Sequence, residues 1–131
     1  MISPGGEFWQ PLRPGLSIFF IDRLHPGLGN KAYKLQPAIE RALADGCSPL
    51  VSLGGAWSNH LHALAQMGHS AGLATVGYVR GDADLPKTMM LEDVEAWGMT
   101  LRFLSRGEYR KRHEASFGQG LLLDYPSGVY V

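Results

Sequence analysis

Two short stretches of the sequence combine residue types that can do chemistry. The first, "GGAWSNH" at residues 54–60, places Ser58, Asn59 and His60 directly after an apolar run. If Ser58 caps a helix, the first-turn N–H groups point outward and the helix dipole adds about half a positive charge, which suits a carboxylate or phosphate. The preceding pair, Gly54 and Gly55, lets a ligand come close to the backbone. From these residues alone, a tight turn and a plain helix cap are the simpler interpretation.

The second stretch, "GNKAYKL" at residues 29–35, contains two lysines. A lysine that is held deprotonated attacks aldehydes, and its Schiff base is how enzymes carry pyridoxal phosphate. Lys31 and Lys34 are three positions apart and share a face on a helix, so the spacing does not choose between them. A lone lysine is more often a solvated surface residue.

Together the two stretches resemble a known enzyme family. Gly29-Asn30-Lys31 with Lys34 downstream, followed by "GGAWSNH" at a matching separation, is similar to the pyridoxal-phosphate enzymes of the 1-aminocyclopropane-1-carboxylate deaminase and D-cysteine desulfhydrase family. The resemblance continues through "IDRLHPGLGNK", "GYVRGD" and "LSRGEYRKRHE" and spans most of residues 16–131. It implies the tryptophan synthase β-like fold and pyridoxal 5'-phosphate as cofactor.

The resemblance also implies a role for each matched residue. Lys31 corresponds to the lysine that forms the Schiff base with the cofactor and later moves the proton. Asn59 corresponds to the residue that hydrogen-bonds the phenolic oxygen of the cofactor. Ser58 is implied to contact the substrate carboxylate and to assist proton transfer, and His60 with the backbone N–H groups completes the carboxylate site. The implied activity is that of a lyase or deaminase on a small amino acid, in a homodimer of the full-length protein, and the bond that breaks stays open.

The family pattern implies a second domain that carries a glycine-rich loop for the cofactor phosphate and a group facing the pyridine nitrogen. Neither has a candidate in these 131 residues. We therefore expect residues 1–131 to be a single α/β domain, the amino-terminal portion of a two-domain enzyme, and inactive alone. One alternative is a non-catalytic α/β binding or assembly module. Another, a nucleotide-binding domain using the glycine pair, is weak because the G-x-G-x-x-G spacing is missing.

Composition narrows the classes of partner. Apolar residues make up 45% and charged residues 18%, and 12 basic residues balance 12 acidic ones, so no nucleic-acid-binding face is indicated. A single cysteine, Cys47, cannot form an internal disulfide, which fits a reducing compartment. The first residues lack the pattern of a signal peptide, and no stretch approaches the roughly 20 apolar residues that span a bilayer. These features predict a cytoplasmic protein that uses no membrane.

Predicted strands and helices alternate along the chain, and these elements position the two stretches. β-branched and aromatic runs predict strands, and apolar residues at helical spacing predict helices between them. The predicted strands cover residues 16–22, 49–53, 72–79 and 99–104, and a further one starts at "GVYV". Such alternation predicts an α/β fold, with a parallel sheet covered by helices on both faces. Ligands bind beyond the carboxyl ends of such strands, where "GGAWSNH" lies.

The predicted helices have recognisable ends. One runs from Lys34 to Gly46, with Leu35, Ala38, Ile39, Ala42 and Leu43 on its apolar face and with Pro37 tolerable only near its first turn. Another follows Ser58, and a third is ended by Gly98. A capping box of Ser105 and Glu108 begins a charged helix that ends near His113, and "EASFGQG" after it is expected to be a loop.

Two polar patterns have plain interpretations. "RGEYRKRHE" at residues 106–114 is interpreted as a solvated helix face, with phosphate binding as the alternative. His60 and His62 lie two apart on a predicted helix and face different ways, and no cysteine or carboxylate pattern supports them, so no metal site is predicted.

Overall fold

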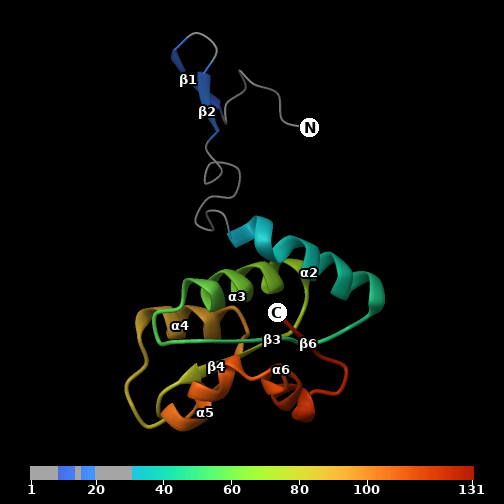
Figure 1. Cartoon of the computed structure of the whole chain (residues 1–131), viewed down its shortest axis with the longest axis vertical. Helices are drawn as coiled ribbons and strands as arrows, with labels where there is room; N and C mark the ends of the chain where they lie inside the picture. The colour runs from blue at the N-terminus through green and yellow to red at the C-terminus, as the bar shows by residue number, and fades with distance from the viewer. Residues whose placement is uncertain (1–8, 14–15, 20–30) are drawn as a thin grey trace.

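The computed structural model describes residues 9–13, 16–19 and 31–131. Its centre is a four-stranded sheet of strands β3 (Leu50–Gly54), β4 (Thr75–Arg80), β5 (Thr100–Leu104) and β6 (Val129–Tyr130). The strand order is β5-β4-β3-β6, and every pair is parallel. The predicted parallel sheet is therefore confirmed, and Figure 1 shows its strands side by side between layers of helix.

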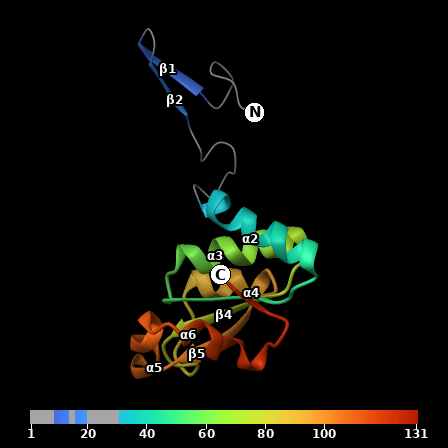
Figure 2. The same cartoon turned by 45° about the vertical axis from the view of Figure 1, so that its right-hand side comes forward.

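Helices cover both faces of this sheet, as the alternation predicts (Figures 1 and 2). On one face lie α2 (Lys31–Asp45), α3 (Asn59–Ala71) and α4 (Met89–Ala96). Their apolar stripes bury a cluster with the sheet, and its most enclosed members include Leu35, Leu61, Leu64 and Val94. On the other face lie α5 (Arg106–Arg110), η1 (Lys111–His113), α6 (Phe117–Leu121) and η2 (Leu122–Asp124). The core on that side is formed by Val51, Val76, Tyr78, Leu104 and Leu121.

Helix α2 differs from its prediction at its start. It begins at Lys31, so Pro37 lies in its second turn and not in the first, where a proline costs least. The helix persists there because Leu35, Ile39 and Ala42 are almost fully buried in the apolar cluster that α2 shares with α3 and the sheet. Leu43, which was expected on the apolar face, is 53% exposed.

The strand predicted at residues 16–22 is present as β2 (Leu16–Phe19), and residues 20–22 lie outside the described residues. It pairs antiparallel with β1 (Trp9–Arg13) in a separate sheet, so it is not part of the parallel sheet. "EASFGQG" is not only a loop, because α6 begins at Phe117. One glycine of this helix, Gly118, has a packing role: a Cβ built there would lie 2.8 Å from the ring of Tyr130.

Residues close in sequence determine where β4 and α5 begin. β4 begins at Thr75 and not at Gly72, because Gly72 ends α3 in the left-handed conformation, at φ 72°. The capping box of Ser105 and Glu108 is present, and it begins α5. Among the described residues, no helix is long and apolar enough to cross a membrane.

Candidate functional site

The "GGAWSNH" stretch forms a short turn between the end of β3 at Gly54 and the start of α3 at Asn59, and is called the Gly54–His60 turn below. The Ser58 N–H donates to the carbonyl of Gly55 at 3.1 Å. The Ser58 Oγ accepts from the Leu61 N–H, also at 3.1 Å. Ser58 is thus the N-cap of α3, as predicted, at the carboxyl end of a parallel strand.

The two glycines of the turn have different surroundings. A Cβ built on Gly54 would lie 2.5 Å from the Ser58 Oγ and 2.7 Å from the Ser58 Cβ. A Cβ on Gly55 would meet no atom within 4 Å. Gly54 is therefore required by the packing of Ser58, whereas only Gly55 borders open space on its Cβ side.

Asn59 and Trp57 are the exposed residues of the turn. Asn59 is the first residue of α3, so its N–H precedes the intrahelical bonding pattern, and no described residue accepts a hydrogen bond from it. Trp57 is 64% exposed. The turn thus presents a backbone donor and an amide side chain outward at a helix N-terminus.

His60 faces inward through one of its ring nitrogens. Its Nε2 lies 2.8 Å from the Oγ of Ser52, a buried residue in the middle of β3. The Ser52 hydroxyl donates to the Val131 carbonyl at 2.7 Å. Because a serine has one hydroxyl hydrogen, Ser52 must accept from Nε2, so the Nε2 of His60 carries a proton. A substrate contact at Nε2 would break this bond.

Ser52 was missed in the sequence, although a serine inside the apolar run "PLVSL" was a usable signal. Thr88 was missed as well. It caps α4 by accepting from the Leu91 N–H at 3.3 Å, and its hydroxyl donates to the carbonyl of Ala56. A threonine directly before a helical apolar pattern is an N-cap signal. The hydrogen bond from Thr88 to Ala56 connects α4 to the Gly54–His60 turn.

The two candidate lysines differ in what the structure describes. Lys31 is the first residue of α2, and its side chain lies outside the described part of the chain. Lys34 is exposed on the same helix. The structure therefore brings Ser58, Asn59 and His60 together on one turn, while the place of the Lys31 side chain stays a prediction.

His62 and His60 have separate partners. The Nε2 of His62 lies 3.1 Å from Oδ2 of Asp93 on α4, and its ring meets that of Trp97 edge to face at 4.8 Å. Within the described ranges, no group of three histidine, cysteine or acidic residues is arranged to hold a metal ion. His62 thus links α3 to α4.

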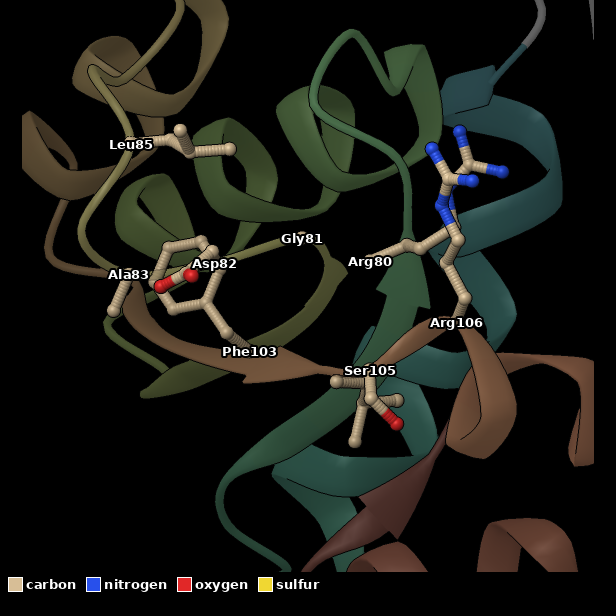
Figure 3. Close-up of a pocket in the computed structure, with 9 residues that line it drawn as sticks. Arg80, Gly81, Asp82, Ala83, Leu85, Phe103, Ser105 and Arg106 are labelled. Atoms are coloured by element: carbon tan, nitrogen blue, oxygen red, sulfur yellow. The ribbon is translucent and has the colours of Figure 1, made fainter.

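A cavity of about 710 Å³ lies at the carboxyl ends of β4 and β5, and its walls include Arg80, Asp82, Phe103 and Arg106 (Figure 3). A smaller cavity of about 90 Å³ shares several of these residues and is also bordered by Ala56. The open space at this edge of the sheet therefore reaches the Gly54–His60 turn.

Comparison with known proteins shows the fold. No family model matches the chain, and no curated protein matches it. Among solved structures, a hydrogen sulfide-producing enzyme from Fusobacterium nucleatum is 18% identical, with a TM-score of 0.56 over 76% of this chain and 28% of that chain. O-ureido-L-serine synthase is 17% identical, with a TM-score of 0.58 over 82% and 34%. An O-acetylserine dependent cystathionine beta-synthase from Helicobacter pylori is 18% identical, with a TM-score of 0.58 over 87% and 36%.

These likenesses show that the chain has the tryptophan synthase β-like fold, as the sequence resemblance implies. The chain spans roughly a third of the length of these three solved structures. The described sheet and its helices correspond to the small-domain part of that fold.

Proposed function

We propose that this chain is part of a pyridoxal-phosphate-dependent lyase or deaminase that acts on a small amino acid. The observation that carries the proposal is the Gly54–His60 turn, which presents Ser58 and Asn59 at the N-terminus of α3, beyond the carboxyl end of β3. The solved structures that are similar to this chain include a hydrogen sulfide-producing enzyme, O-ureido-L-serine synthase and an O-acetylserine dependent cystathionine beta-synthase. These similarities support a substrate related to cysteine or serine.

The described residues fit a bound amino acid beside the cofactor. Ser58 uses its Oγ as an acceptor for the helix cap, and no described residue accepts its hydroxyl hydrogen. That hydrogen and the Asn59 N–H can therefore both be donated to a carboxylate, at the positive end of the α3 dipole. Preorganised donors of this kind hold a negative charge without reorganising.

In this proposal each residue of the site has one role. When bound, pyridoxal phosphate supplies a ring that takes up the electrons of a carbanion at the substrate α-carbon. Lys31 would hold the cofactor and move the α-proton with its Nζ. The Asn59 side-chain amide would hydrogen-bond the cofactor's phenolic oxygen. Ser58 would orient the substrate carboxylate, and His60 would hold the turn against β3 through Ser52.

The finer assignment rests on the sequence resemblance. The motif pair at Lys31 and Ser58 favours a D-cysteine desulfhydrase-like or 1-aminocyclopropane-1-carboxylate deaminase-like reaction, in a homodimer of a longer protein. The first would break a C–S bond, and the second would open a cyclopropane ring and release ammonia.

A second function, a non-catalytic α/β binding or assembly module, is favoured by one set of contacts. Gly54, Ser58 and His60 all have structural partners within the chain, so their presence is explained without any ligand. In that case the turn keeps its form because it caps α3 and anchors it to β3.

One experiment separates the two functions. The purified chain is mixed with pyridoxal phosphate, reduced with borohydride, and digested for peptide mapping by mass spectrometry. We expect the reduced cofactor on Lys31, with loss of labelling in Lys31→Ala and unchanged labelling in the control Lys34→Ala. Labelling of Lys34 instead would contradict the residue assignment. Absence of a labelled lysine at stoichiometric cofactor, both in this chain and in a longer form of the protein that carries the second domain, would favour the non-catalytic module.

A further inference from the structure

Four arginines and one tyrosine line a groove of about 350 Å³ at the same edge of the sheet, called the arginine groove below. Its lining residues are Arg80, Arg106, Tyr109, Arg110 and Arg112. Arg80 ends β4, and the others come from α5 and η1. No acidic residue lines the groove.

The fold brings these arginines together from distant parts of the sequence. The parallel register pairs Arg80 with Leu104, so the end of β4 lies beside the start of α5. The capping box at Ser105 fixes that start and thereby the position of Arg106. Figure 3 shows the side chains of Arg80 and Arg106 extending in the same direction from the two strand ends.

Tyr109 holds two of the guanidinium groups. The Arg112 Cζ lies 4.5 Å from the centre of the Tyr109 ring, and the Arg80 Cζ lies 5.7 Å from it. The Arg112 Nη1 also donates to the Tyr109 carbonyl at 3.1 Å. These cation–π contacts orient the guanidinium groups but leave their charge uncompensated.

Within the described residues, no carboxylate forms an ion pair with an arginine of the groove. The ion pairs of these residues join His62 to Asp93, Lys87 to Glu95 and Arg102 to Asp124. Glu108 accepts from the Ser105 N–H at 3.0 Å in the capping box.

Asp82 borders the adjoining cavity and is turned away from the groove. It accepts from the Asp84 N–H at 2.9 Å, and Figure 3 shows it beside Phe103, away from Arg80 and Arg106. The guanidinium groups that line the groove carry like charges, which repel one another. A bound anion would remove that repulsion.

The cavity of about 710 Å³ continues from this charged groove, since Arg80 and Arg106 line both. Its other walls include the apolar side chains of Leu85 and Phe103. Cavities of this size with apolar walls and a few convergent polar groups are typical of sites for small organic ligands. The groove and the cavity together thus fit a molecule with an anionic head and an organic body.

We propose that the arginine groove binds the phosphate or diphosphate group of a small organic molecule whose body lies in the adjoining cavity. Guanidinium groups bind phosphate oxygens in a bidentate, charge-assisted manner, and several of them in one groove match a group with more than one negative charge. Arg80 and Arg106 contact the phosphate at the junction with the cavity, and Arg110 and Arg112 add charge around it.

The test uses inorganic pyrophosphate as probe and the 131-residue chain as the protein. Binding is followed by two-dimensional NMR of backbone and arginine Nε–H groups at constant ionic strength, with sodium chloride as reference. We expect saturable shifts at Arg80, Arg106 and Tyr109, and an affinity about tenfold weaker in Arg80→Gln or Arg106→Gln, because each removes a charged hydrogen-bond donor. The matched control Arg41→Gln, on the exposed side of α2, should change the affinity less than about twofold.

Several outcomes would overturn the proposal. These are shifts no larger than those with chloride, equal affinity in all three variants, or tighter binding of a single-stranded oligonucleotide than of pyrophosphate. Competition between pyrophosphate and pyridoxal phosphate would identify the cofactor as the source of the phosphate, and independent binding would identify a separate ligand. Pyrophosphate has no aldehyde and cannot react with Lys31, so its binding succeeds or fails independently of the proposed function.

Discussion

The Gly54–His60 turn and the arginine groove lie at the same edge of the sheet and differ in how their side chains are used. In the turn, Ser58 caps α3 and His60 bonds to buried Ser52. In the groove, the side chains of three of the four arginines have no hydrogen bond or ion pair within the described residues. Polar and charged side chains thus have two uses at this edge of the sheet. In the turn they form contacts that stabilise the fold, and in the groove they are available to a ligand. Substitutions in the turn should therefore alter stability, and substitutions in the groove should not.

The largest effect is expected at Gly54. In Gly54→Ala the new methyl group would overlap with Ser58, and we expect a loss of about 1–3 kcal/mol in the free energy of unfolding, as for other overpacked sites. Gly55→Ala is the matched control, because its methyl group meets open space and its φ is not positive. Urea denaturation followed by circular dichroism measures both. Equal stability of the two variants would break the contrast between the glycines.

Ser52→Ala should cost about 1–2 kcal/mol, because it leaves the Nε2–H of His60 and the carbonyl of Val131 without their bond to the serine. Ser70→Ala, at an exposed position on α3, is the control. The same denaturation experiment applies, and the NMR signals of the His60 ring should shift in the first variant only. Unchanged ring signals would mean that the bond does not orient His60.

Ser58→Ala should cost about 1 kcal/mol by removing the N-cap acceptor of α3, and Ser58→Asp should restore most of that loss because aspartate caps equally well. If stability returns in Ser58→Asp while cofactor labelling of Lys31 is retained, the capping role and any substrate role of Ser58 can be measured separately. A Ser58→Asp variant as unstable as Ser58→Ala would show that the cap is not what Ser58 contributes.

The smallest effect is expected in the groove. Arg106→Gln should change the free energy of unfolding by less than about 0.5 kcal/mol, since an exposed arginine without an ion pair adds little to stability. The measurement is again urea denaturation, at low and at moderate salt. A stabilised variant at low salt would still agree with repulsion within the groove, whereas a loss above 1 kcal/mol would place Arg106 among the structural residues.

Structural features that depend on residues close together in the sequence are predicted well. The Ser58 cap and the capping box of Ser105 with Glu108 depend on residue types three positions apart, and both are present. The parallel sheet follows from the alternation of strands and helices. α6 was not predicted because Gly118 and Gly120 oppose a helix locally, whereas the packing of Gly118 against Tyr130 joins two separate elements, α6 and β6.

The partners of Ser52 could not be predicted for the same reason. The residue type was visible, but its bond to Val131 depends on which strand lies beside β3. The pairing of β2 with β1 also depends on a neighbour that the β-branched and aromatic residues of β2 do not specify. The arginine groove likewise requires the register of β4 with β5, since Arg80 is distant in sequence from the arginines of α5 and η1.

The hydrogen bond between Ser52 and Val131 joins residues 79 positions apart, and β6 touches β3 through only two paired residues. Closing a loop of that length is entropically costly, so such contacts form late in folding. We therefore expect the His60 ring to reach its orientation only after the rest of the sheet is assembled. In kinetic terms, Ser52→Ala should accelerate unfolding and leave the refolding rate nearly unchanged, a φ-value near zero that stopped-flow measurements would detect.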